Sequence, residues 1–130
     1  MIMSRFMGLI NLENQDYNST ITMFNKQFTV RIESSRSESD TKKAVSKVAK
    51  ELLKPATTKK ICSLAVMFIK DSYGKKVTED QIMKKVVPIA ILIEDYEEVA
   101  IICDYDPWTN DGLGIQIIPN ISVNDRAAFC

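Results

Sequence analysis

A chain of 130 residues with 45% hydrophobic side chains is large enough for a single core, and we expect residues 1–130 to form one domain. Its 17 basic and 17 acidic residues give a formal net charge of zero, which disfavours a nucleic-acid or membrane-surface binder that acts through overall charge. The chain has no histidine, so the usual catalytic triads and histidine-containing metal motifs are excluded by composition.

A β-hairpin is the first predicted element. Between Thr20 and Glu33, β-branched and aromatic residues stand on both sides of a two-residue polar break at Asn25-Lys26. The second arm alternates apolar with polar residues, which predicts one buried and one exposed face.

A first amphipathic helix should follow a polar, serine-rich loop over residues 34–40. Apolar residues recur at helical spacing across residues 44–52, ahead of Pro55. The other face of this helix carries Lys42, Lys43, Lys47, Lys50 and Lys54. We interpret these lysines as solvated charge rather than a nucleic-acid surface, since no aromatic residues are interleaved with them.

A second helix is expected after Pro55, because apolar residues repeat at helical spacing until the Gly74 break. A third, short helix should begin at Thr78, where Thr78 and Gln81 match a capping box, and end before Pro88.

The remaining sequence is typical of strands. Apolar runs at residues 88–93, 99–103 and 113–118 are separated by polar turns, which predicts three consecutive antiparallel strands. We therefore expect an α+β fold rather than a βαβ parallel sheet. Its antiparallel sheet should consist of an N-terminal hairpin and a C-terminal three-strand meander, packed against two or three helices.

Charge is unevenly distributed along the chain. Residues 36–85 carry 13 basic and 6 acidic side chains, a net +7, whereas residues 86–130 carry 1 basic and 8 acidic side chains, a net −7. Either the two halves interleave and cancel in the fold, or an acidic face remains.

The cysteines do not form a recognisable metal or disulfide pattern. Cys62, Cys103 and Cys130 are widely spaced and odd in number, so we expect neither a disulfide framework nor a zinc site. Cys62 and Cys103 lie in apolar segments, which predicts buried, reduced thiols.

The sequence contains no motif that requires a cofactor. No glycine-rich phosphate-binding loop is present. A calcium loop beginning at Asp104 would place Thr109 and Ile115 where an EF-hand needs Gly and Glu, so the nearby aspartates are interpreted as turn residues. We expect no metal, no other cofactor and no catalytic residues.

Targeting signals are also weak. Residues 1–10 hold an apolar stretch interrupted by Arg5, without an obvious small-residue cleavage site, so we do not expect a signal peptide. No apolar run approaches the roughly 20 residues that cross a bilayer. We expect a cytoplasmic protein that contacts no membrane.

One segment carries a family resemblance. It consists of the strand at residues 99–103, the acidic turn Asp104-Tyr105-Asp106-Pro107-Trp108 and the strand start Gly112-Leu113-Gly114-Ile115. Together these residues resemble small bacterial domains of toxin–immunity loci. The resemblance covers mainly residues 87–118. It implies a cytoplasmic immunity protein of a polymorphic-toxin or contact-dependent growth-inhibition system, which binds and blocks a cognate toxin, expected to be a nuclease.

Acidic turns supply the candidate binding residues, because a nuclease cleft is basic and an acidic surface can occupy it. The candidates for contact with the toxin are Glu94, Asp95, Glu97 and Glu98 in one turn and Asp106, Trp108 and Asp111 in the next. Trp108 is either an interface anchor or a cover for the end of the core.

Two other functions stay open at this point. The chain is alternatively a non-enzymatic adaptor that joins a larger assembly through its hairpin or an exposed sheet edge, or an uncharacterised enzyme that uses carboxylates or Cys62. The sequence does not specify the oligomeric state.

Overall fold

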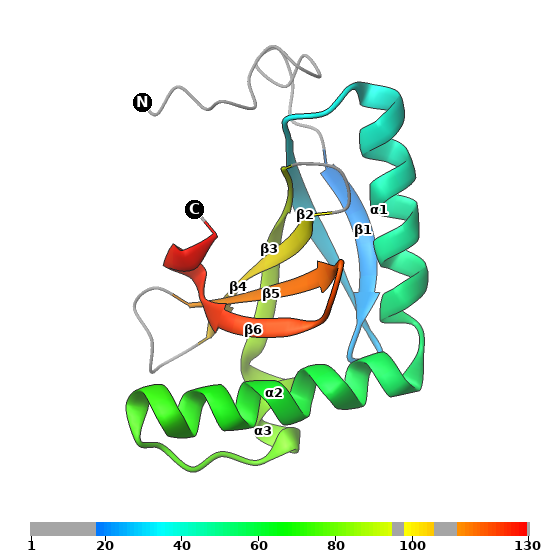
Figure 1. Ribbon diagram of the computed structural model, residues 1–130. Coiled ribbons are helices and arrows are strands. Elements are labelled where there is room, and N and C mark those ends of the chain that lie inside the picture. Colours follow the sequence, from blue (N-terminus) through cyan, green and yellow to red (C-terminus); the bar gives the residue numbers. More distant parts are fainter. Residues whose placement is uncertain (1–17, 95–97, 106–111, 130) are drawn as a thin grey trace.

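Within residues 18–94, 98–105 and 112–129, which the computed structural model describes, six strands form one sheet (Figure 1). The elements, in chain order, are β1 (Asn18–Met23), β2 (Lys26–Ser34), α1 (Glu38–Leu52), α2 (Pro55–Tyr73), α3 (Glu79–Lys85), β3 (Val86–Ile93), β4 (Val99–Tyr105), β5 (Leu113–Ile118), β6 (Ser122–Asp125) and a 3-10 turn, η2 (Arg126–Ala128). The helices thus separate an N-terminal hairpin from a C-terminal meander, which confirms the predicted α+β class.

The strands lie side by side in chain order, β1 to β6. All pairs in this described sheet are antiparallel except β2 and β3, which are parallel. The parallel pair was not predicted, and it arises because α1, α2 and α3 return the chain to the end of the sheet where β2 begins. The short strand β6 was also missed, because its sequence, Ser-Val-Asn-Asp, has little strand propensity.

The hairpin is confirmed, but its turn lies one residue earlier than predicted. Met23 pairs with Lys26, so the turn residues are Phe24 and Asn25, and both have positive φ, 55° and 63°. Positive φ at both positions defines a type I′ turn, the kind that matches the twist of a two-residue hairpin. An aromatic residue seldom takes this conformation. Phe24 does so here because its side chain is buried in the core.

Helix α1 begins at Glu38, inside the stretch predicted to be a loop. The Ser37 side chain accepts a hydrogen bond from the Asp40 backbone N–H at 3.1 Å and so caps the helix. One turn further on, the buried hydroxyls of Thr41 and Ser34 form a 2.6 Å hydrogen bond that ties α1 to the end of β2. The serine-rich segment is therefore a helix start, not only a connection.

The other two helices have the predicted termini. Pro55 occupies the first turn of α2, and Gly74 ends it with φ 67°, a left-handed conformation that glycine adopts easily. At the start of α3, Thr78 and Gln81 form the predicted capping box, with both reciprocal hydrogen bonds present.

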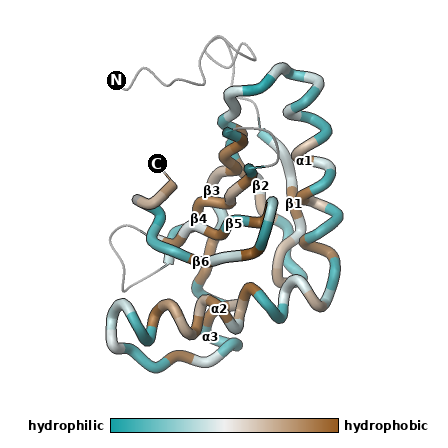
Figure 2. The backbone as a smooth tube through the Cα atoms, in the orientation of Figure 1, coloured by the Kyte–Doolittle hydropathy of each residue, from teal (hydrophilic) through white to brown (hydrophobic). Residues whose placement is uncertain are grey.

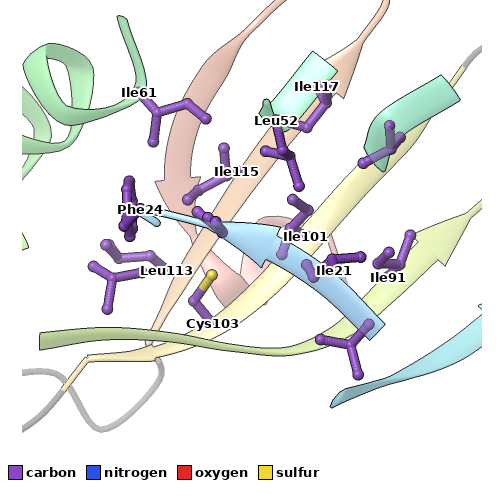
Figure 3. Packing of buried hydrophobic residues seen from close by; sticks show 14 of the residues in the cluster. Ile21, Phe24, Leu52, Ile61, Ile91, Ile101, Cys103, Leu113, Ile115 and Ile117 are labelled. Carbon is purple, nitrogen blue, oxygen red and sulfur yellow. The ribbon is translucent and has the colours of Figure 1, made fainter. Parts of the chain in front are cut away.

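The main core lies between the helices and one face of the sheet. Figure 3 shows Ile21 of β1, Leu52 of α1 and Ile61 of α2 close to side chains from the meander. Hydropathy follows this arrangement, since α1 alternates between hydrophilic and hydrophobic residues along its length (Figure 2). The largest fully buried residues include Ile32, Ile69, Ile82, Ile91, Ile101, Leu113 and Ile115.

Candidate functional site

The sheet face that does not contribute to the main core carries a second, smaller apolar cluster. Ala90, Leu92 and Ile102 are buried there, each at most 4% exposed. They lie on β3 and β4, whose register pairs Ala90 with Ile102. Their cover comes in part from Phe129, at the end of the described chain, and this C-terminal turn lies on the opposite side of β3 and β4 from α1 (Figure 1).

The C-terminal turn is held against the sheet by Arg126. Its guanidinium Nη1 lies 2.9 Å from Asp104 Oδ1, and its backbone N–H donates to the Gly112 carbonyl at 3.3 Å. The Phe129 N–H in turn donates to the Arg126 carbonyl at 3.0 Å. These bonds fix the place where the Phe129 ring meets the sheet.

Two glycines near this turn have different roles. Gly112 takes φ 74° where the chain enters β5, a conformation that glycine adopts easily. Gly114 has no positive φ; there the absence of a side chain makes room for Phe129, because a Cβ at Gly114 would overlap the aromatic ring.

A groove of about 410 Å³ opens beside this C-terminal turn. Its walls contain apolar side chains from β3 and β4, the Phe129 ring, two carboxylates and one amide. Its lining residues are Leu92, Glu94, Glu98, Val99, Ala100, Gln116, Ala128 and Phe129. This groove, with these eight residues, is the candidate site.

Two of the seven predicted contact residues, Glu94 and Glu98, line the groove. They flank the β3–β4 turn, where the Glu94 N–H donates to the Glu98 carbonyl at 3.1 Å. The Ser35 hydroxyl donates to the Glu94 carbonyl, and the Ser35 N–H donates to the Ile93 carbonyl at 2.9 Å. The backbone that carries both carboxylates is thus fixed to the end of β2. Glu98 is exposed and Glu94 is half-buried.

The other predicted contact residues, Asp95, Glu97, Asp106, Trp108 and Asp111, lie outside the described residues. Strand β4, which the structure describes, separates the two acidic turns in the sequence. Strand β4 begins at Val99 and ends at Tyr105, six residues on. At about 3.3 Å per residue the two ends of β4 are roughly 20 Å apart. The described acidic residue near the second end, Asp104, pairs with Arg126.

Sequence reasoning missed the apolar half of the groove. Phe129 and Gln116 were not singled out, because no local pattern links them to residues 92–100. The pairing of Ala100 with Gln116 and the seat of Phe129 over Gly114 are long-range contacts.

The two described cysteines are free and buried, as predicted. Burial raises the pKa of Cys62 to about 11, with a further contribution from the charge of Glu79. Burial also raises the pKa of Cys103 well above its ordinary range, and Asp104 adds to this. Neither thiol lines the groove. Both are therefore packing residues with little thiolate at neutral pH.

A second hollow, of about 390 Å³, lies where the hairpin turn meets the α1–α2 corner. It is lined mainly by apolar residues, including Phe24, Leu52, Leu53, Pro55 and Met83. None of the predicted contact residues lines it. Among the described residues, no three His, Cys, Asp or Glu side chains are grouped so as to hold a metal ion.

Comparison with known proteins adds no relative: no family model, curated protein or solved structure matches this chain. In the described part of the chain, no helix has both the length and the apolar character needed to cross a membrane.

Proposed function

We propose that this chain is an immunity protein that binds a cognate bacterial toxin, expected to be a nuclease, and blocks it by direct contact through the groove beside β3 and β4. The observation that carries the proposal is the presence of Glu94 and Glu98 beside apolar residues in the walls of a groove on the face of the sheet away from the main core. The resemblance of residues 87–118 to toxin–immunity domains gives the class of partner.

Charge complementarity supports a basic partner. Glu94 and Glu98 begin and end a turn whose sequence also contains Asp95 and Glu97, and residues 86–130 carry a net −7. A nuclease cleft is lined by cations that bind phosphates, so an acidic protein surface can compete with the nucleic acid for it. Complementary charges also speed association, which favours rapid neutralisation.

The apolar part of the groove supports a specific, lasting complex. The half-buried Phe129 ring offers an apolar surface that a partner side chain can cover, above Leu92 and Ala100, which are at most 5% exposed, and the carboxylates lie beside it. Protein interfaces commonly have this construction, with a desolvated anchor at the centre and polar groups around it. A lysine or arginine suits both parts, because its stem is apolar and its end is cationic.

An immunity protein should be encoded beside its toxin, so the functional test is to look for a toxin domain in the neighbouring genes and to co-express it with this chain. We expect the wild-type chain to rescue growth and to co-purify with the toxin. A chain that neither rescues growth nor co-purifies contradicts the immunity function.

Charge reversals then locate the interface. The double variant Glu97→Lys with Glu98→Lys should reduce co-purification. The variant Asp106→Lys with Asp111→Lys tests the other end of β4. A matched control is Glu38→Lys with Asp71→Lys, since both residues are exposed on α1 and α2 and neither lines the groove. If both test variants bind the toxin as the wild type does, the acidic turns are solubilising surface and the interface lies elsewhere.

A further inference from the structure

Strand β1 forms one outer edge of the sheet. Met23 and Lys26 flank the two-residue turn and therefore form a hydrogen-bonded pair. Hydrogen-bonded pairs recur at every second residue, so Ile21 and Phe28 form the next one. The alternating residues Asn18, Thr20 and Thr22 then direct their backbone N–H and C=O groups away from β2. Among the described residues, no other strand pairs with these groups.

In its own sequence and pairing, β1 lacks three features that usually protect an outer strand, namely charge, proline and a bulge, and the protection that it does have is helix α1 packed beside it. The six residues of β1, Asn-Ser-Thr-Ile-Thr-Met, include no charge and no proline, and its pairing with β2 has no bulge. The opposite edge, β6, is different, because it has four residues and ends in Asn124 and Asp125. A long, uncharged edge is a template for another strand, whereas a short, polar one is not.

We propose that β1 pairs with β1 of a second copy of this chain, in an antiparallel arrangement with a two-fold axis at Thr20. In this register Thr20 faces Thr20 of the second copy, and Thr22 faces Asn18 in both directions. All of these residues direct their backbone groups outward, so each pair makes two ladder hydrogen bonds. The two sheets become one continuous sheet.

Side-chain chemistry favours a copy of the same chain. Thr20 is exposed on the face away from the core, and a Thr–Thr pair across two strands is a stabilising contact. Two copies of an uncharged strand do not repel one another, and the chain's net charge of zero adds no long-range repulsion. The dimer is independent of toxin binding, because the groove is built from β3, β4, β5 and the C-terminal turn.

The test is sedimentation velocity of the full chain over about two decades of concentration, since strand pairing alone buries a small interface and is concentration-dependent. We expect the wild type to pass from monomer to dimer. Thr20→Lys places two lysines opposite one another and should remain monomeric, as should Thr20→Glu. An equimolar mixture of the two variants should recover a dimer, which also shows that both are folded.

Two further variants separate edge pairing from other causes. Thr20→Pro removes an N–H that β2 does not use, so it should abolish the dimer while the monomer's circular dichroism stays unchanged. Thr29→Lys is the matched control, because Thr29 is exposed opposite Thr20 but lies on the inner strand β2, and it should dimerise like the wild type. A wild type that is monomeric throughout, variants at Thr20 that still dimerise, or a Lys–Glu mixture that stays monomeric would each overturn the proposal.

Discussion

Replacing Phe129 by alanine tests whether the C-terminal turn builds the candidate site. The Phe129 ring packs on Ala90, Leu92 and Ile102 and forms one wall of the groove. Truncation of a fully buried phenylalanine costs about 3–5 kcal/mol, and Phe129 is half-buried, so we expect a loss of about 1.5–2.5 kcal/mol in the free energy of unfolding. For a chain of this size, that corresponds to a fall of about 5–10 °C in Tm.

Gly114 provides an internal check on this magnitude. In the wild type, Gly114→Ala should destabilise the fold by about 1–3 kcal/mol, because the new Cβ overlaps the Phe129 ring. The Phe129→Ala change removes the three atoms nearest to that Cβ, so in this background Gly114→Ala should be neutral or slightly stabilising, since alanine orders more readily than glycine in a strand. The coupling follows from the direct contact of the two residues.

Urea denaturation of the wild type, the two single variants and the double variant measures the cycle. We expect the midpoints to shift without a change in slope, which indicates altered stability rather than an altered unfolded state. Additive losses in the double variant, or a Phe129→Ala midpoint equal to that of the wild type, would refute the packing of Phe129 over Gly114.

Four further outcomes are expected. Thiol reagents should modify Cys62 and Cys103 slowly at pH 8, with the Cys62 rate rising about tenfold per pH unit until its pKa near 11; fast labelling of the native protein at pH 8 would contradict their burial. The unfolded Cys62 thiol ionises near pH 9, whereas the folded one stays protonated up to about pH 11. The free energy of unfolding should therefore fall by up to about 1.4 kcal/mol per pH unit between about pH 9 and 11. This fall should be smaller in Cys62→Ala. Gly74→Ala should cost about 1 kcal/mol through its left-handed φ alone, since nothing lies within 4 Å of the added Cβ. Thr41→Val should cost about 1–3 kcal/mol, because the buried Ser34 hydroxyl loses its hydrogen bond to Thr41 and keeps only the one it accepts from the Arg36 N–H. Thermal melts of both variants check these values.

Local sequence signals predicted most of the fold, because they act over a few residues. The Thr78–Gln81 spacing fixes the start of α3, and the Gly74 break fixes the end of α2. The hairpin turn was misplaced by one residue because Phe24 gains more from burial than it loses from positive φ, and burial is decided by the whole fold. The parallel pairing of β2 with β3 likewise depends on how the three helices return the chain, which no short motif encodes.

The candidate site was predictable only in its charged part. A turn with four carboxylates is visible in the sequence, and Glu94 and Glu98 do line the groove. The apolar wall depends on Phe129 reaching back to a glycine on β5, and on Arg126 pairing with Asp104 across 22 positions of the chain. Long-range contacts of this kind leave no local periodicity.

Calorimetric titration is the most direct test of the groove as the toxin-binding site. The toxin domain is titrated with the wild type and with the double variant Glu94→Lys, Glu98→Lys, each at low and at physiological salt. We expect the wild type to bind with an affinity that weakens as salt rises, because exposed charges are screened beyond about 8 Å at physiological ionic strength. The double variant should bind at least about tenfold more weakly, a loss of about 1.4 kcal/mol or more. Equal affinities of the two proteins at both salt concentrations, with the variant still folded, would contradict binding at this groove.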